Sequence, residues 1–95
     1  GPQGPYNPRL SNAMAEEHRR FVQSLTPEET MLVTLRDELY GGDWNRMLRD
    51  LQDRRDGRPY VFKLVNLINE DIARIERLKG YEQTYAVNLA DHVQS

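Results

Sequence analysis

One stripe of apolar residues constrains the fold of this chain more than any other feature of the sequence. From Pro59 to at least Lys79, no internal proline or glycine interrupts a pattern that is typical of an amphipathic helix. The apolar residues recur at spacings of three and four: Val61, Leu64, Val65, Ile68, Ile72, Ile75 and Leu78. Because such spacings place side chains on one side of a helix, the stripe predicts a long helix packed against something else.

The C-terminal limit of this helix has two interpretations. Basic residues in the last turns before Gly80 are typical of a helix C-terminus, where cations meet the negative end of the helix dipole. Tyr81, Tyr85 and Leu89 nevertheless continue at a spacing of four, and one glycine costs only about 1 kcal/mol relative to alanine. We expect the helix to continue. The alternative is a break at Gly80, with the last segment folded back as a fifth helix.

Two shorter helices are predicted in the first half of the chain. The first covers residues near 14–24. The second begins at Pro27, because Thr26 and Glu29 have the spacing of a capping box and proline suits the first helical position. It should end before the glycine pair at 41–42, which permits the positive-φ exit common after helices.

A third short helix follows the glycine pair. Asp43 is a good N-cap residue, and the apolar side chains after it have helical spacing: Trp44, Met47, Leu48 and Leu51. Gly57 marks its end, and Pro59 suits the first turn of the long helix. The sequence therefore predicts an all-α fold, a small helical bundle of three short helices packed on one long C-terminal helix.

Residues 1–13 differ in composition from the rest of the chain. They hold three of the five prolines and no acidic residue, and Ser11-Asn12-Ala13 before Met14 is typical of a cleaved expression tag. We interpret 1–13 as a tag remnant and 14–95 as a single helical domain. The alternatives are a short collagen-like start and a polyproline ligand, since Pro2, Pro5 and Pro8 repeat every third residue.

Composition limits the compartment and the class of partner. The chain has no cysteine, no apolar run near the 20 or so residues that span a bilayer, and no signal peptide. We therefore expect a cytoplasmic protein without a membrane partner. The formal net charge of −2 is unlike that of a general polyanion binder, which usually carries a basic excess.

The sequence offers no motif for catalysis. His18 and His92 are its only histidines, and neither has the spacing that places two metal ligands on one helix face. No glycine-rich phosphate loop or nucleophile motif is present. We therefore expect no enzyme activity, no catalytic residue, no cofactor and no metal.

Helix lengths point to protein association as the function. The short helices span about 16–21 Å each, whereas a helix from Pro59 to Leu89 would span about 46 Å. If the second and third helices form a hairpin, they cover only about half of that length, which leaves apolar side chains for a partner. We expect a non-enzymatic interaction or dimerisation module, most simply a homodimer. The residues expected to bind the partner are Ile68, Ile72, Ile75, Leu78, Tyr81 and Tyr85.

An accessory nucleic-acid-binding or regulatory domain is the alternative function. Its candidate contacts are five arginines within thirteen residues: Arg46, Arg49, Arg54, Arg55 and Arg58. Trp44 and Tyr60 lie at the margins of this cluster. Aspartates alternate with the arginines, however, so the same segment could form an ordinary solvated helix face.

Overall fold

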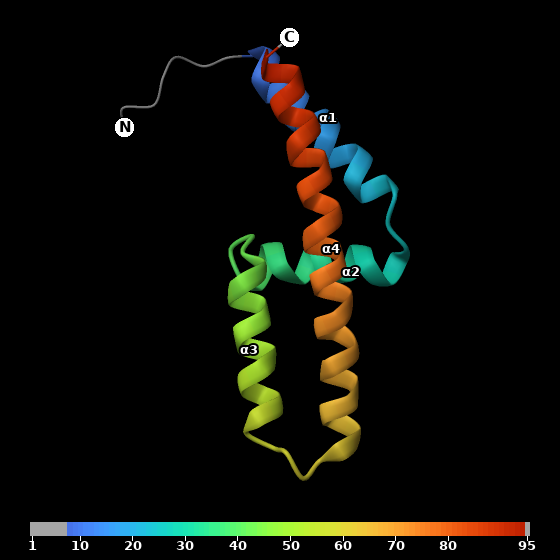
Figure 1. The fold of residues 1–95 in the computed structure, drawn as a ribbon, viewed down its shortest axis with the longest axis vertical. Helices are drawn as coiled ribbons and strands as arrows, with labels where there is room; N and C mark the ends of the chain where they lie inside the picture. Colours follow the sequence, from blue (N-terminus) through green and yellow to red (C-terminus); the bar gives the residue numbers. More distant parts are fainter. Residues whose placement is uncertain (1–7, 95) are drawn as a thin grey trace, which may run out of the picture. The chain divides into compact units, whose positions relative to one another are not determined.

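The structure, a computed structural model, describes the backbone of residues 8–94 and the side chains of residues 9–88. It contains four α-helices (Figure 1): α1 (Pro8–Gln23), α2 (Pro27–Leu39), α3 (Trp44–Asp56) and α4 (Phe62–Gln94). No strand occurs within residues 8–94. The prediction of a small all-α bundle with one long C-terminal helix is therefore confirmed.

The long helix α4 runs through Gly80 without a break, as predicted. It begins at Phe62, three residues after Pro59, because Pro59 is used in a turn. The N–H of Val61 donates to the carbonyl of Arg58 at 3.1 Å, which places Pro59 at the second position of that turn, where its fixed φ is favoured. The N–H of Val65 then donates to the carbonyl of Val61 and opens the helix.

The first helix starts earlier than the sequence pattern predicted. It covers Pro8–Gln23, so the prediction of a start near residue 14 is wrong by six residues. Proline at the first position has the φ that a helix needs, and Leu10 extends the helical spacing of Met14 and Phe21 toward the N-terminus. The interpretation of 1–13 as a tag remnant stays a prediction, and residues 1–7 lie outside the described residues.

The predicted ends of α2 are confirmed at atomic detail. The hydroxyl of Thr26 accepts from the N–H of Glu29 at 3.2 Å, and the N–H of Thr26 donates to the Glu29 carboxylate at 2.9 Å. This capping box gives a hydrogen-bond acceptor to two backbone N–H groups, those of Thr26 and Glu29, which have no partner inside the helix. At the other end, Gly41 and Gly42 have φ of 62° and 80°, and the N–H of Gly42 donates to the carbonyl of Arg36.

The start of α3 also follows the prediction. The carboxylate of Asp43 accepts from the N–H groups of Asn45 and Arg46, at 2.9 and 3.3 Å. These donors have no partner inside the helix, so the aspartate supplies one. The helix ends at Asp56, followed by Gly57.

The contacts divide the chain into two compact units that share α4. The three-helix unit, Leu25–Gly80, contains α2, α3 and the first half of α4. The two-helix unit consists of Gly1–Ser24 and Tyr81–Ser95, so it pairs α1 with the last part of α4. The expectation of one helical domain over 14–95 stays a prediction.

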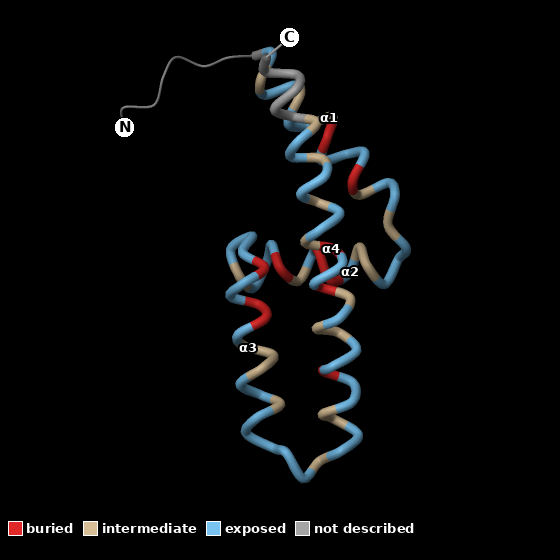
Figure 2. Tube along the Cα trace, viewed as in Figure 1, coloured by how far each residue is buried: buried red, intermediate tan, exposed pale blue. Residues whose placement is uncertain are grey.

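Within the three-helix unit, α3 and α4 lie side by side and run in opposite directions, and α2 crosses them (Figure 1). Two hydrogen bonds fix the register: Lys79 Nζ to Asn45 Oδ1 and Arg55 Nη1 to Asn69 Oδ1, both 2.9 Å. In both bonds the two residue numbers add to the same value, as an antiparallel pair requires. The buried apolar residues of this unit (Figure 2) are Leu32, Val33, Trp44, Met47, Leu48, Ile68, Ile75 and Leu78.

The described residues of the two-helix unit bury few apolar side chains. Here α1 and the end of α4 also run in opposite directions (Figure 1), and the rings of Phe21 and Tyr85 lie 5.7 Å apart between their centroids. Among residues 9–24 and 81–88, Phe21 is the one apolar residue that is buried. The other buried residue of that set is Glu17. The described parts of the two units therefore differ sharply in how many apolar side chains they bury.

A phenol and a carboxylate join α2 to α3 in the three-helix unit. The hydroxyl of Tyr40 donates a short hydrogen bond to the carboxylate of Asp50. This bond raises the pKa of Tyr40 and, together with Arg54, lowers the pKa of Asp50 below its usual value. The stabilisation through Asp50 is present above its unfolded pKa and is lost as pH falls through the lowered folded pKa. The stabilisation through Tyr40 is present below its unfolded pKa and is lost as pH rises through the raised folded pKa.

We therefore expect Tyr40→Phe to raise the pKa of Asp50 toward its ordinary value. The difference between folded and unfolded pKa then shrinks, so stability should fall less between mildly acidic and acidic pH than in the wild type. NMR titration of the Asp50 carboxyl carbon measures the pKa, and urea unfolding at several pH values measures the stability. Tyr60→Phe, at an exposed position, is the control. An unchanged Asp50 titration in Tyr40→Phe would contradict the assignment.

Candidate interaction surfaces

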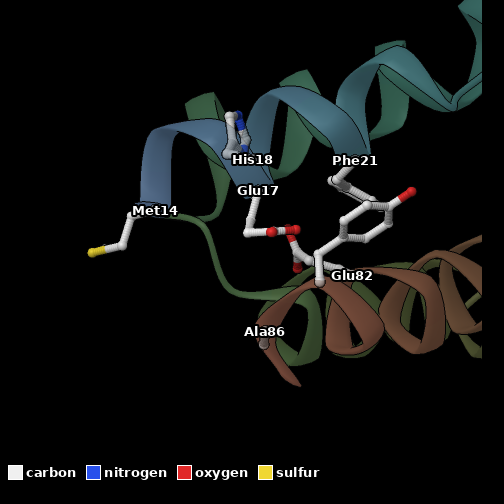
Figure 3. A pocket seen from close by; sticks show the side chains of 7 residues that line it. Met14, Glu17, His18, Phe21, Glu82 and Ala86 are labelled. Carbon is white, nitrogen blue, oxygen red and sulfur yellow. The ribbon is translucent and has the colours of Figure 1, made fainter. Parts of the chain in front are cut away.

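A hollow of about 160 Å³ lies between α1 and the last part of α4 in the two-helix unit (Figure 3). Most of its lining surface is apolar. Its lining residues are Met14, Glu17, His18, Phe21, Glu82, Tyr85 and Ala86. The hollow is open to solvent, so it is a shallow groove in the surface of the helix pair.

Two carboxylates face each other at the centre of this helix pair. Figure 3 shows the Glu17 side chain extending from α1 toward Glu82 on α4. Glu17 is only 3% exposed, and its Oε1 lies 4.0 Å from Nη1 of Arg20, whose Nε also bonds Glu16. A buried carboxylate costs free energy unless it is paired. A glutamate therefore occupies a position where an apolar residue would have added to the core.

Large apolar side chains are exposed on both helices of the two-helix unit. Met14 on α1 is 52% exposed, and Tyr81 and Val87 on α4 are 54% and 59% exposed. Met14 also lines the groove, and Tyr81 lies one helical turn before Tyr85, which lines it too. This unit thus combines a small interior with an apolar surface.

The structure divides the residues that we expected to bind a partner between the two units. In the three-helix unit, Ile68, Ile75 and Leu78 are buried and Ile72 is half-buried. Ile68, Ile75 and Leu78 thus pack within the three-helix unit, and the expectation that they bind a partner stays a prediction. In the two-helix unit, Tyr81 is exposed and Tyr85 is half-buried against Phe21.

The five candidate arginines do not form one surface. At 100° per residue, Arg46 and Arg55 lie about 180° apart around α3. Arg55 points to α4, where it bonds Asn69, and it also pairs with Asp56. Arg54 pairs with Asp50 at 3.2 Å. Arg49 and Arg58 are exposed, and Arg58 lies beyond the end of α3. Spacing in sequence alone therefore overstated how far these side chains converge.

The turn between α3 and α4 presents a surface that the sequence pattern only hinted at. Tyr60 is 74% exposed and Phe62 is 76% exposed, the two highest values among the large apolar residues of the described chain. Arg58 and Lys63 are exposed beside them, and neither forms an ion pair with a described residue. The available signal was the run Tyr60-Val61-Phe62 directly after Pro59, because Val61 is half-buried and the aromatic residue on either side of it is exposed.

A second hollow lies next to this turn, between α3 and α4. Its lining residues are Arg55, Asp56, Pro59, Val65 and Asn69. The guanidinium of Arg55 donates from Nη1 to Asn69 at 2.9 Å and from Nε to Asp56 at 3.1 Å. Amide, carboxylate and guanidinium groups therefore line this hollow together with the apolar side chains of Pro59 and Val65.

No group of three or more His, Cys, Asp or Glu side chains in the described part of the chain could hold a metal ion. His18 lines the first groove and is exposed, whereas the side chain of His92 lies outside the described residues. None of the described helices is both long and apolar enough to cross a bilayer.

Comparison with known proteins identifies no relative of this chain. A scan against protein-family models, a search of curated proteins and a search of solved structures each find no match to this chain. The function must therefore be argued from the residues themselves.

Proposed function

We propose that this protein is a non-enzymatic association module that forms a homodimer through its two-helix unit. The observation that carries the proposal is the contrast between the units in buried apolar residues. The described residues of the two-helix unit bury Phe21 alone among apolar side chains, whereas the three-helix unit buries eight. A helix pair buries apolar surface on one side only, so a stable unit needs a further layer.

The exposed residues of the two-helix unit supply what that further layer would cover. Met14, Tyr81 and Val87 are all just over half exposed, so burying the exposed part of each side chain stabilises an association by about 0.8–1.5 kcal/mol, half of the value for full burial. Two antiparallel helix pairs that pack face to face make a four-helix bundle, a common architecture for a dimer. A second copy of the chain brings the same apolar surface, as a two-fold symmetric interface requires.

The size and composition of the unit support the same conclusion. Compact units below about 40 residues usually need disulfides, metals or oligomerisation, and Gly1–Ser24 with Tyr81–Ser95 falls below that size. The chain has no cysteine, so no disulfide can supply this stability. Association with a second copy of the chain would supply it instead.

Sedimentation equilibrium at micromolar concentration tests the proposal. We expect a mass of twice the chain mass of 11.1 kDa for the wild type, and a shift toward the chain mass for Met14→Lys. A lysine there would place a charge in the dimer interface without disturbing the monomer, because Met14 is 52% exposed.

Met31→Lys is the matched control, since Met31 is a 64% exposed methionine on α2 in the other unit. It should leave the dimer unchanged. A wild-type mass of 11.1 kDa at every concentration would overturn the dimer. If Met31→Lys dissociated the dimer and Met14→Lys did not, the dimer interface would not lie on the two-helix unit.

A further inference from the structure

We propose that the turn between α3 and α4 binds single-stranded nucleic acid, a function that is independent of the dimer. The binding surface, called the hairpin tip below, consists of Arg58, Tyr60, Phe62 and Lys63. It joins two strongly exposed aromatic rings to two exposed cations. Aromatic platforms that stack bases, next to cations that meet phosphates, are the common elements of single-strand binding.

Charge at the tip is opposite in sign to that of the whole chain. The segment Asp53–Lys63 contains four basic and two acidic residues, whereas the chain has a net charge of −2. Within this segment, Arg55 is paired with Asp56, and Arg54 bonds Asp50 on the preceding turn. Arg58 and Lys63 remain for an external anion, since neither forms an ion pair with a described residue. An anionic partner is therefore the one that complements the tip.

The aromatic residues are not explained by packing. Phe62 is the first residue of α4 and Tyr60 lies in the turn before it, yet their exposed fractions are 76% and 74%. Val61, between them, is half-buried, so the local backbone turns one apolar side chain inward and two aromatic rings outward. Exposed rings of this kind gain free energy when a flat partner covers them.

The hollow beside the tip favours a nucleic acid over a lipid surface. Arg55 already bonds Asn69 Oδ1 and Asp56 Oδ1. The polar groups that remain for a ligand are therefore the Asn69 Nδ2 donor and the Asp56 Oδ2 acceptor, beside the apolar side chains of Pro59 and Val65. A nucleobase has a flat ring that the apolar side chains of Pro59 and Val65 can contact. Its edge has donors and acceptors that the polar groups of the hollow can bond, so a nucleobase suits this lining. A lipid surface would use the rings and the cations but would leave these polar groups without a role.

Fluorescence anisotropy with labelled oligothymidylate and oligouridylate tests the proposal on the full chain at low salt. We expect binding whose logarithm falls with the logarithm of salt concentration with a slope of about −1.4, because two cations each release about 0.7 counterion from a single strand. Tyr60→Ala and Phe62→Ala should each weaken binding about 5- to 150-fold, the range of one lost base stack. The double change Arg58→Gln and Lys63→Gln should flatten the salt dependence.

Leu39→Ala is the matched control, since it removes a 65% exposed apolar side chain from α2, outside both the hairpin tip and the proposed dimer interface. It should leave oligonucleotide binding unchanged. Preference for one oligonucleotide over the other identifies DNA or RNA as the natural strand. Absence of binding to both at low salt would overturn the proposal, as would equal losses in Tyr60→Ala and Leu39→Ala. Binding to phosphatidylserine vesicles without binding to either oligonucleotide would overturn it in favour of a lipid surface.

Discussion

Replacement of Ile75 by alanine is expected to lower the free energy of unfolding by about 2–5 kcal/mol. Ile75 has no exposed surface and, with Phe21 and Leu78, is one of the largest fully buried side chains among residues 9–88. Truncation to alanine removes apolar atoms from the core and leaves a cavity that neighbouring side chains fill only in part. Urea unfolding followed by far-UV circular dichroism measures the change.

Leu67→Ala is the control for Ile75→Ala, because Leu67 lies two turns earlier on the same helix and is 55% exposed. Its loss should stay below about 1 kcal/mol, as for most surface changes. If Ile75→Ala is too unstable to fold, Ile75→Val should still lower stability by about 0.5–1.5 kcal/mol. Equal losses at positions 67 and 75 would show that α4 does not bury the side that the structure assigns to the core.

Proline at position 80 should have the second large effect. Gly80 lies inside α4, and proline in a helix interior removes a backbone hydrogen bond and clashes with the preceding turn, at a cost of about 3 kcal/mol or more. We expect Gly80→Pro to lower the free energy of unfolding by this amount. The helical character of residues 81–88 should fall with it. NMR Cα shifts and amide exchange for that segment measure the effect.

Gly80→Ala is the companion variant and should act in the opposite direction. A Cβ built on Gly80 meets no atom within 4 Å, and Gly80 is not among the glycines with positive φ. Alanine should therefore stabilise the helix by about 0.5–1 kcal/mol. If proline and alanine at this position had the same effect on residues 81–88, α4 would not be continuous there.

Local chemistry explains which parts of this fold could be predicted from sequence. The capping box of Thr26 and Glu29 and the cap at Asp43 use hydrogen bonds between residues at most three apart, so their spacing alone locates the helix starts. The continuation of α4 through Gly80 followed from the small cost of one glycine in a helix. The start of α1 at Pro8 was not predicted, because residues 1–13 hold three prolines and no acidic residue, a composition that is unlike that of a helix.

The candidate surfaces depended on information of a different kind. Periodicity showed that Ile68, Ile75 and Leu78 share one side of α4, but it could not show that the same chain covers them. The arginines of α3 were close in sequence and yet lie on different sides of the helix, where Arg55 is held by Asn69. Likewise, nothing in the pattern showed that the helix pair of the two-helix unit buries so few of its apolar side chains.

The sequence by itself thus determined the four helices, most of their ends and the all-α class, because helix formation is governed by spacing and capping within a few residues. Only the tertiary structure decided which stripe is covered internally, which apolar residues stay exposed at Met14, Tyr81 and Val87, and how far Tyr60 and Phe62 extend into solvent. Burial depends on contacts between residues far apart in the chain, and such pairings are fixed by packing. The hydrogen bond that Lys79 donates to Asn45 joins residues that are equally distant in sequence.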